Sequence, residues 1–263
     1  MTELLHLTYD GNFKLESNAT VLMSSVCNEE GKDTDIQLQL DVTPMHPQGG
    51  GQPTDTGKIS SENGTSVSVK FVSLDRSSDI VTHTCSVSPD DDLNAIMNDF
   101  SVGSKVKVFV DADRRRILSE CHTAGHVVDS AMAKCGQTLQ PTKGYHFSEG
   151  PYVEYKGTVP LEERAGLLES LNEAFSSLVD EDIETRIETL IKDDAEAICN
   201  RLQQNFDFSG YEREVRIVTA ANMSSPCGGT HVRSTGELKA RGWNVVGIKS
   251  KKGAVRVRYA PSS

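Results

Sequence analysis

Two short stretches, about a hundred residues apart, constrain the fold of this chain more than any other feature. The first is HTAGH at positions 122–126, and the second is CGGTH at positions 227–231. Together they offer three imidazoles and one thiolate, from His122, His126, Cys227 and His231. This is a complete ligand set for one zinc ion per chain. A fold that uses these side chains as one site must bring the two segments together.

The histidine pair is predicted to lie on a helix that runs from Arg114 to Cys135. Asp111 and Asp113 are suitable N-cap residues, and apolar residues then recur at three- and four-residue steps. His122 and His126 fall one turn apart beside the apolar stripe. Both imidazoles therefore point toward the interior edge of the domain, which is the direction that a shared metal ion needs.

Either pair alone is weak evidence for a metal site. A pair on a helix combined with a pair on a glycine-containing loop is moderately strong evidence for one. Four protein ligands are typical of a structural zinc, while a catalytic zinc keeps a position open for water. The H-E-x-x-H peptidase pattern is not met, because Thr123 stands where those enzymes carry their glutamate base. Asp129, one turn beyond His126, is the candidate general base unless the substrate supplies one. No other catalytic residue is assigned beyond the zinc site.

Residues 1–110 are predicted to be rich in β-strands. Short runs of Val, Ile and Thr alternate with turn-forming clusters, which is typical of a small barrel or sandwich. The runs are 19–27, 35–42, 65–74, 80–85 and 104–111, and the clusters are 28–31, 62–64 and 75–78. A short helix is predicted at 91–99.

The segment Pro44–Gly57, PMHPQGGGQPTDTG, interrupts this block. Consecutive glycines flanked by prolines cannot form a regular strand or helix. The segment is either an ordinary surface loop or a loop whose backbone N–H groups approach a ligand closely.

Residues 111–263 are predicted to form a second domain of helices and antiparallel strands. Strands are expected at 144–148, 151–156, 215–218, 243–249 and 254–259, with a hairpin turn at 250–253. Two amphipathic helices are expected, one beginning at Pro160 and one from Glu181 to Leu202. The chain is therefore predicted to be of the α+β class, with a small N-terminal β-barrel followed by a two-layer α/β sandwich that carries the zinc site.

The charge distribution adds a possible partner. The net charge is −11, which alone does not suggest a nucleic-acid binder. From Arg233 to Arg258, however, there are eight basic residues and one acidic residue. A surface that faces a polyanion and a scatter of surface lysines are equally consistent with this pattern. The candidate contacts are Lys249, Lys251, Lys252, Arg256 and Arg258.

The cysteines and the N-terminal sequence indicate the cellular compartment of the protein. Six cysteines without a C-x-x-C pair suggest reduced thiols in the cytoplasm. No signal peptide and no membrane span are expected, and a monomer is favoured.

The motifs HTAGH, GYHFS with PYVEY, and CGGTHVRSTGE resemble the editing domain of alanyl-tRNA synthetase and its free-standing relatives, the AlaX proteins. The upstream segment DVTPMHPQGGGQPTDTG resembles the glycine-rich motif of the longer AlaX forms. Met45 departs from the pattern, because the family often has an aromatic residue there. The resemblance covers nearly the whole chain, and no aminoacylation domain is expected.

The resemblance implies a trans-acting deacylase that cleaves a wrong amino acid, serine or glycine, from tRNA(Ala). His122, His126, Cys227 and His231 match the family's zinc positions. Thr43 and Gln52, with Gly49, Gly50 and Gly51, match the region associated with the amino-acid pocket. Thr43 could supply the polar partner that a serine hydroxyl needs.

Two other functions remain open. One is editing of Ser-tRNA(Thr), as in threonyl-tRNA synthetases, although the GGGQP loop favours the alanine type. The other is a non-catalytic, zinc-stapled module that binds tRNA.

Overall fold

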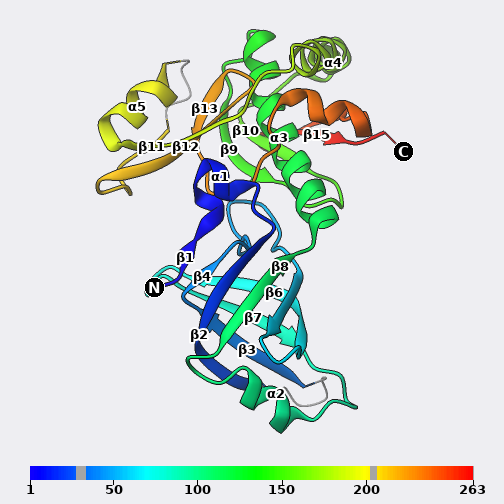
Figure 1. Ribbon diagram of the computed structural model, residues 1–263. Coiled ribbons are helices and arrows are strands. Elements are labelled where there is room, and N and C mark those ends of the chain that lie inside the picture. The colour runs from blue at the N-terminus through cyan, green and yellow to red at the C-terminus, as the bar shows by residue number, and fades with distance from the viewer. Residues whose placement is uncertain (28–33, 202–205, 263) are drawn as a thin grey trace. The chain divides into compact units, whose positions relative to one another are not determined.

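The computed structural model describes residues 1–27, 34–201 and 206–262. The chain divides into two compact units, coloured along the chain in Figure 1. Unit 1 comprises Met1–Gly49 and Pro53–Arg115, and unit 2 comprises Gly50–Gln52 and Arg116–Ser263. The short segment Gly50–Gln52 thus belongs to unit 2, although the residues on both sides of it belong to unit 1.

Unit 1 is built on a closed β-barrel with the strand order β2-β3-β7-β6-β5-β8 (Figure 1). The strands are β2 (Glu16–Cys27), β3 (Asp35–Leu40), β5 (Gly57–Ser61), β6 (Ser66–Asp75), β7 (Ile80–Ser86) and β8 (Lys105–Val110). Side chains along a strand point alternately into and out of the barrel. In β3, Ile36, Leu38 and Leu40 are buried while the residues between them are partly exposed. The predicted barrel is confirmed, although the sequence pattern did not reveal β5.

Short elements complete unit 1. They are β1 (Glu3–Leu4), which pairs with β4 (Val42–Thr43), the 3-10 helix η1 (Leu5–Leu7), α1 (Tyr9–Asn12) and α2 (Leu93–Asp99). The side chain of Asp92 caps α2 by accepting hydrogen bonds from the backbone N–H groups of Asn94 and Ala95. The predicted turn at 28–31 lies outside the described residues.

A buried ion pair anchors the glycine-rich segment within unit 1. Arg115 and Asp55 are paired and almost fully buried. The Asp55 carboxylate also accepts a hydrogen bond from the backbone N–H of His46, and Arg115 donates to the carbonyl oxygen of Pro44. Both ends of the segment are therefore tied to one guanidinium, and the loss of either partner would leave a buried charge uncompensated.

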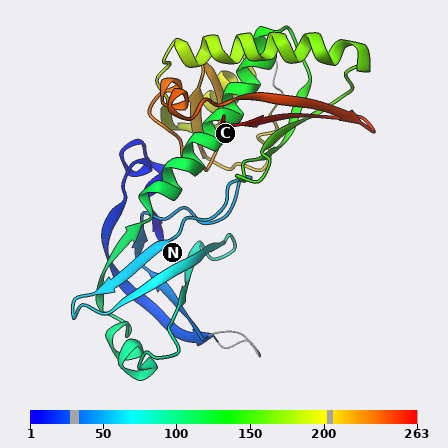
Figure 2. The ribbon, with the colours of Figure 1, turned by 90° about the vertical axis from the view of Figure 1, so that its right-hand side faces the viewer.

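Unit 2 combines two long helices with a four-stranded antiparallel sheet. The helices are α3 (Ala112–Lys134), whose first residues belong to unit 1, and α4 (Arg164–Asp180). The sheet has the order β14-β15-β10-β9, from β14 (Asn244–Lys251), β15 (Ala254–Ala260), β10 (Tyr152–Lys156) and β9 (Gln140–Tyr145). Apolar residues of α3, α4 and one face of the sheet form a single core. Figure 2 shows α4 and the β14–β15 hairpin as separate layers of this unit.

A smaller sheet in unit 2 corrects one prediction. The segment expected to form a helix from Glu181 to Leu202 contains β11 (Arg186–Ile191) and then the short α5 (Lys192–Asn200). β11 pairs along its whole length with β12 (Glu214–Ala220), which also pairs with β13 (Met223–Pro226). Cross-strand pairing therefore overrode an apolar spacing that also fits a helix. Leu202 lies outside the described residues.

The remaining elements are the 3-10 helices η2 (Leu161–Glu163) and η3 (Thr235–Arg241). All six cysteines are free thiols. None of the described helices is both long enough and apolar enough to cross a membrane.

Candidate metal centre

The helix α3 carries the histidine pair as its sequence predicts. Asp111 begins the helix by accepting a hydrogen bond from the backbone N–H of Arg114. Gly136 ends it with a φ of 71°, a left-handed conformation that favours glycine. Between them, the imidazole rings of His122 and His126 are stacked with centroids 5.3 Å apart.

The second pair comes from the loop that follows β13. Cys227 begins this loop, and its backbone N–H donates to the carbonyl oxygen of Arg216 on β12. Gly229 lies so close to His122 that a Cβ atom built on it would be 2.2 Å from two atoms of the imidazole. Glycine is therefore required for the loop to pass this closely over the helix.

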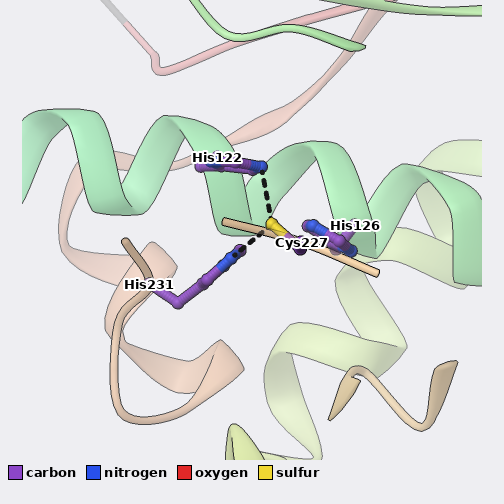
Figure 3. Close-up of side chains that lie close together, drawn as sticks. All are labelled: His122, His126, Cys227 and His231. Carbon is purple, nitrogen blue, oxygen red and sulfur yellow. Dashed lines mark hydrogen bonds between the residues drawn. The ribbon is translucent and has the colours of Figure 1, made fainter. Parts of the chain in front are cut away.

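The four candidate ligand atoms converge on one point (Figure 3). The Sγ atom of Cys227 lies 3.4 Å from Nε2 of His122 and 3.3 Å from Nε2 of His231. All four ligand atoms, including that of His126, lie within 4.8 Å of one another. Tetrahedral zinc bonds of about 2.0–2.3 Å would separate the ligand atoms by roughly 3.3–3.6 Å. The cluster could therefore hold a metal ion.

Gln52 orients His122. The Gln52 amide is itself fixed, because its Oε1 accepts from the backbone N–H of Thr230 and its Nε2 donates to the Thr230 hydroxyl. The same Oε1 lies 2.7 Å from Nδ1 of His122. Since an amide oxygen only accepts, Nδ1 carries the proton and donates it, which leaves the Nε2 lone pair for a metal ion.

The other two candidate histidine ligands each have a side-chain hydroxyl beside Nδ1. Nδ1 of His231 lies 3.1 Å from the hydroxyl of Thr123, and Nδ1 of His126 lies 3.2 Å from the hydroxyl of Ser225. Each Nδ1 is thus engaged by a side-chain hydroxyl, which can accept from it, and the tautomer with the proton on Nδ1 leaves Nε2 for coordination. This arrangement around ligating histidines is typical of protein metal sites.

Burial keeps the imidazole of His126 neutral at pH 7. Loss of hydration, with a smaller contribution from the charge of Arg216, lowers the pKa of His126 to about 4. Burial raises the pKa of the Cys227 thiol, whereas the charge of Arg216 works in the opposite direction. At neutral pH a metal ion therefore meets an available imidazole lone pair but must displace the thiol proton.

His146 extends the cluster, and its position was not recognised from the sequence. Its ring stacks on that of His122 with centroids 4.1 Å apart, and its Nδ1 lies 2.6 Å from the hydroxyl of Tyr259. Burial, with a smaller contribution from His126, lowers its pKa to about 3. The motif GYHFS could have indicated this position. In a strand, a residue between two outward-facing aromatic residues points inward, so the histidine of this motif faces the interior.

The three loop glycines have different surroundings. Gly51 packs tightly in unit 2: its carbonyl oxygen accepts from the backbone N–H of His146, and an added Cβ would lie 2.3 Å from the carbonyl oxygen of Gly144. An added Cβ on Gly50 would meet nothing within 4 Å. Gly49 belongs to unit 1. That these glycines and Gln52 contact substrate stays a prediction.

Thr43 is fully buried in unit 1. Its hydroxyl lies 2.9 Å from Nε2 of His83 and accepts a hydrogen bond from the backbone N–H of Met45. Its proposed contact with a serine hydroxyl stays a prediction.

Asp129 lies in the wall of a separate cavity in unit 2. The cavity has a volume of about 220 Å³, and its other lining residues include Met132, Leu139 and Met223. The hydroxyl of Tyr155 donates to the Asp129 carboxylate over 2.6 Å. Burial raises the pKa of Asp129 to about 7, against the smaller effect of that hydrogen bond. None of the four candidate ligands lines this cavity, and a general-base role for Asp129 stays a prediction.

The predicted tRNA-contacting residues all lie exposed on the β14–β15 hairpin. They are Lys249, Lys251, Lys252, Arg256 and Arg258. The hairpin turn is tight, with Lys252 and Gly253 both at positive φ.

Comparisons with known proteins identify relatives along most of the chain, although no family model matches. The alanyl-tRNA editing protein AlaX-M of Methanosarcina barkeri is 29% identical over 223 residues, which is 84% of this chain and 86% of that protein. The alanine–tRNA ligase of Methanobrevibacter smithii is 31% identical over 229 residues, and that of Fervidobacterium nodosum is 29% identical over 250 residues.

The match to the ligases covers 85% and 90% of this chain but only 23% and 26% of those two proteins. The chain thus spans about a quarter of the ligases that it matches, whereas it aligns with most of the AlaX-M protein. The chain is therefore similar to AlaX-M along most of both proteins, and to a segment of the alanine–tRNA ligases.

Proposed function

We propose that this protein is an alanyl-tRNA editing hydrolase. It removes a wrong amino acid, serine or glycine, from tRNA(Ala) by cleaving the ester to the terminal ribose. The observation that carries this proposal is the homology to AlaX-M along 84% of the chain, combined with a metal-competent cluster in the same chain.

We propose that the cluster binds one zinc ion, because imidazole and thiolate are ligands that zinc prefers. When bound, zinc would supply Lewis-acid chemistry at the ester or hold the substrate's amino group or hydroxyl. The chain's own contribution is positional. Gln52, Thr123 and Ser225 fix the three imidazoles, and burial keeps His126 uncharged.

Partial exposure supports a catalytic rather than a purely structural centre. His122 and His231 are almost fully buried, at 2% and 1% exposure, whereas His126 and Cys227 are partly exposed. A ligand set that is accessible on one side leaves room for a substrate to approach. The basic residues of the β14–β15 hairpin would contact the tRNA backbone.

Two competing functions give different results in one assay. Ser-, Gly- and Ala-tRNA(Ala), together with Ser-tRNA(Thr), are incubated with metal-loaded protein, and the loss of labelled amino acid is followed. We expect fast deacylation of Ser-tRNA(Ala) and little loss from Ala-tRNA(Ala). Preferential hydrolysis of Ser-tRNA(Thr) would replace the proposal with threonine-type editing. An absence of hydrolysis on all four substrates would favour the non-catalytic module.

A further inference from the structure

One face of the four-stranded sheet in unit 2 is strongly cationic, in a protein whose net charge is −11. The other face packs on α3 and α4 through residues such as Val153, Val255 and Val257. Within the bounds of the four strands there is one acidic residue, Glu154. The six basic residues there are all exposed: Lys143, Lys156, Lys249, Lys251, Arg256 and Arg258. We call this surface the open sheet face.

Strand register places these residues side by side. Lys249 pairs with Arg256, which pairs with Glu154, which in turn pairs with Lys143. Positions directly opposite one another on neighbouring strands project from the same face of a sheet. The charges therefore form rows across the sheet rather than a random scatter.

Aromatic rings are interleaved with these cations. Tyr145 is stacked between two rings: Phe147, with centroids 4.6 Å apart and an interplanar angle of 13°, and Tyr152, at 5.2 Å and 18°. The guanidinium of Arg256 lies 4.6 Å from the centroid of the Tyr152 ring and is held by Glu154. The three rings and this guanidinium form a continuous ladder, and each ring is partly exposed.

We infer that the open sheet face binds single-stranded RNA, with an unpaired base stacking on the Phe147 end of the ladder and phosphates contacting the surrounding cations. Tyr145 and Tyr152 support the partly exposed Phe147 ring from one side, which leaves its outer face for a base, and flanking Lys and Arg residues neutralise the backbone. An acidic peptide or a rigid duplex would use the charges but leave the rings without a role. This inference deepens the proposed function. It rests on the proposed function only for the identity of the RNA, which would be tRNA(Ala).

The test compares two probes of equal length and charge. One is a fluorescein-labelled oligoadenylate of about 12 nucleotides, and the other is an abasic oligonucleotide of the same length. Binding is measured by fluorescence anisotropy at several salt concentrations. We expect the wild-type protein to bind the oligoadenylate more tightly than the abasic probe, because only the former can stack.

Phe147→Leu and Tyr145→Leu retain apolar side chains and remove aromatic faces. Each is expected to weaken oligoadenylate binding about 5-fold to 100-fold, to leave abasic binding unchanged and to keep the salt dependence of the wild type. Replacing Lys249 and Lys251 with Gln should weaken both probes and reduce the salt dependence. Phe71→Leu removes an aromatic residue with 38% exposure from β6 and serves as the matched control.

Equal wild-type affinity for the two probes would overturn the inference, as would unchanged oligoadenylate binding by both aromatic variants that retain the wild-type circular dichroism spectrum. Equal binding of a duplex or of polyglutamate would reduce the face to a general cationic patch and would also overturn it. These measurements involve no hydrolysis. If the protein hydrolyses Ser-tRNA(Ala) but shows no base-dependent RNA binding, only the RNA-binding inference is wrong. If it shows base-dependent RNA binding but hydrolyses no tRNA, only the proposed function is wrong.

Discussion

The Nδ1 atom of His122 and the Oε1 atom of Gln52 lie 2.7 Å apart, although the two residues are separated by 70 positions in the chain. The same oxygen accepts from the backbone N–H of Thr230. One amide thus joins the histidine helix to the loop that carries the other two candidate ligands.

Gln52→Leu should lower zinc affinity, because the imidazole of His122 would lose the partner that fixes its tautomer and ring orientation. Loss of such a partner typically reduces metal affinity about 10-fold to 100-fold. Competition with a chromogenic chelator measures the change. Gln48→Leu, at a glutamine in unit 1, should leave the affinity unaltered, and equal effects of the two substitutions would count against an orienting role for Gln52.

The two glycines of the CGGTH loop, Gly228 and Gly229, provide a matched pair of substitutions. Gly229→Ala would place a Cβ atom 2.2 Å from the His122 ring and 2.7 Å from the Gln52 amide oxygen, whereas Gly228→Ala meets nothing within 4 Å. Gly229→Ala should therefore displace the loop and reduce both zinc affinity and stability, while Gly228→Ala should be close to neutral. Chelator competition and thermal unfolding distinguish them. Tolerance of alanine at position 229 would show that the loop does not pass this close to the helix.

Thr43→Val removes a hydroxyl that is bonded to His83 and to the backbone of Met45. Because both partners are buried, the substitution should cost roughly 1–3 kcal/mol in the free energy of unfolding. Thr43→Ser retains the hydroxyl and should recover most of that loss. If Thr43 also contacts the serine of the substrate, Thr43→Val lowers the ratio of Ser- to Ala-tRNA(Ala) hydrolysis. An unchanged ratio would limit Thr43 to a structural role.

The carboxyl group of Asp129 should make stability depend on pH. Its pKa in the folded protein is raised to about 7 from an ordinary value of 3.8. Between about pH 4 and pH 7 the folded state therefore keeps a proton that the unfolded state has lost, so this contribution to stability falls as the pH rises. It is fully present below the unfolded pKa and is lost above about pH 7.

Asp129→Asn should remove this dependence. The difference in the free energy of unfolding between wild type and variant should change by about 2 kcal/mol from pH 4 to pH 7. This figure is smaller than a fully buried carboxyl would give, because Asp129 is partly exposed. Urea unfolding across this range measures it, with the exposed Asp194→Asn as the control. A constant difference between wild type and Asp129→Asn would contradict the raised pKa.

The sequence predicted those parts of the fold that local patterns determine. The helix α3 has a capping aspartate, an apolar stripe and a glycine end, and the barrel strands alternate, so both were recognised. The segment β11 was mistaken for helix because Ile187 and Leu190 also fit a helical spacing. Its structure is decided by pairing with β12 and by packing of Ile187 on Val218 and Ala220, which are contacts between distant segments.

The candidate site likewise contains some residues that local sequence patterns predict and others that they do not. The four ligand residues were found because their spacing of four is local within each pair. The residues that orient them could not be found by spacing, because Thr230 lies 178 positions from Gln52 and Ser225 lies 99 positions from His126. Thr123 was noted only as the absence of a peptidase base, yet its hydroxyl contacts Nδ1 of His231. Only the folded chain reveals that role.

Hydrolysis of a mischarged tRNA should depend on the metal cluster, and metal content and deacylation measured on the same preparation test this dependence. The wild-type protein should bind one zinc ion per chain, hydrolyse Ser-tRNA(Ala), lose activity on chelation and regain it when zinc is restored. Cys227→Ala should lose zinc and activity together, while Cys27→Ala retains both. Full hydrolysis by the metal-free wild type, or an unchanged zinc content and activity in Cys227→Ala, would show that hydrolysis does not depend on the metal cluster.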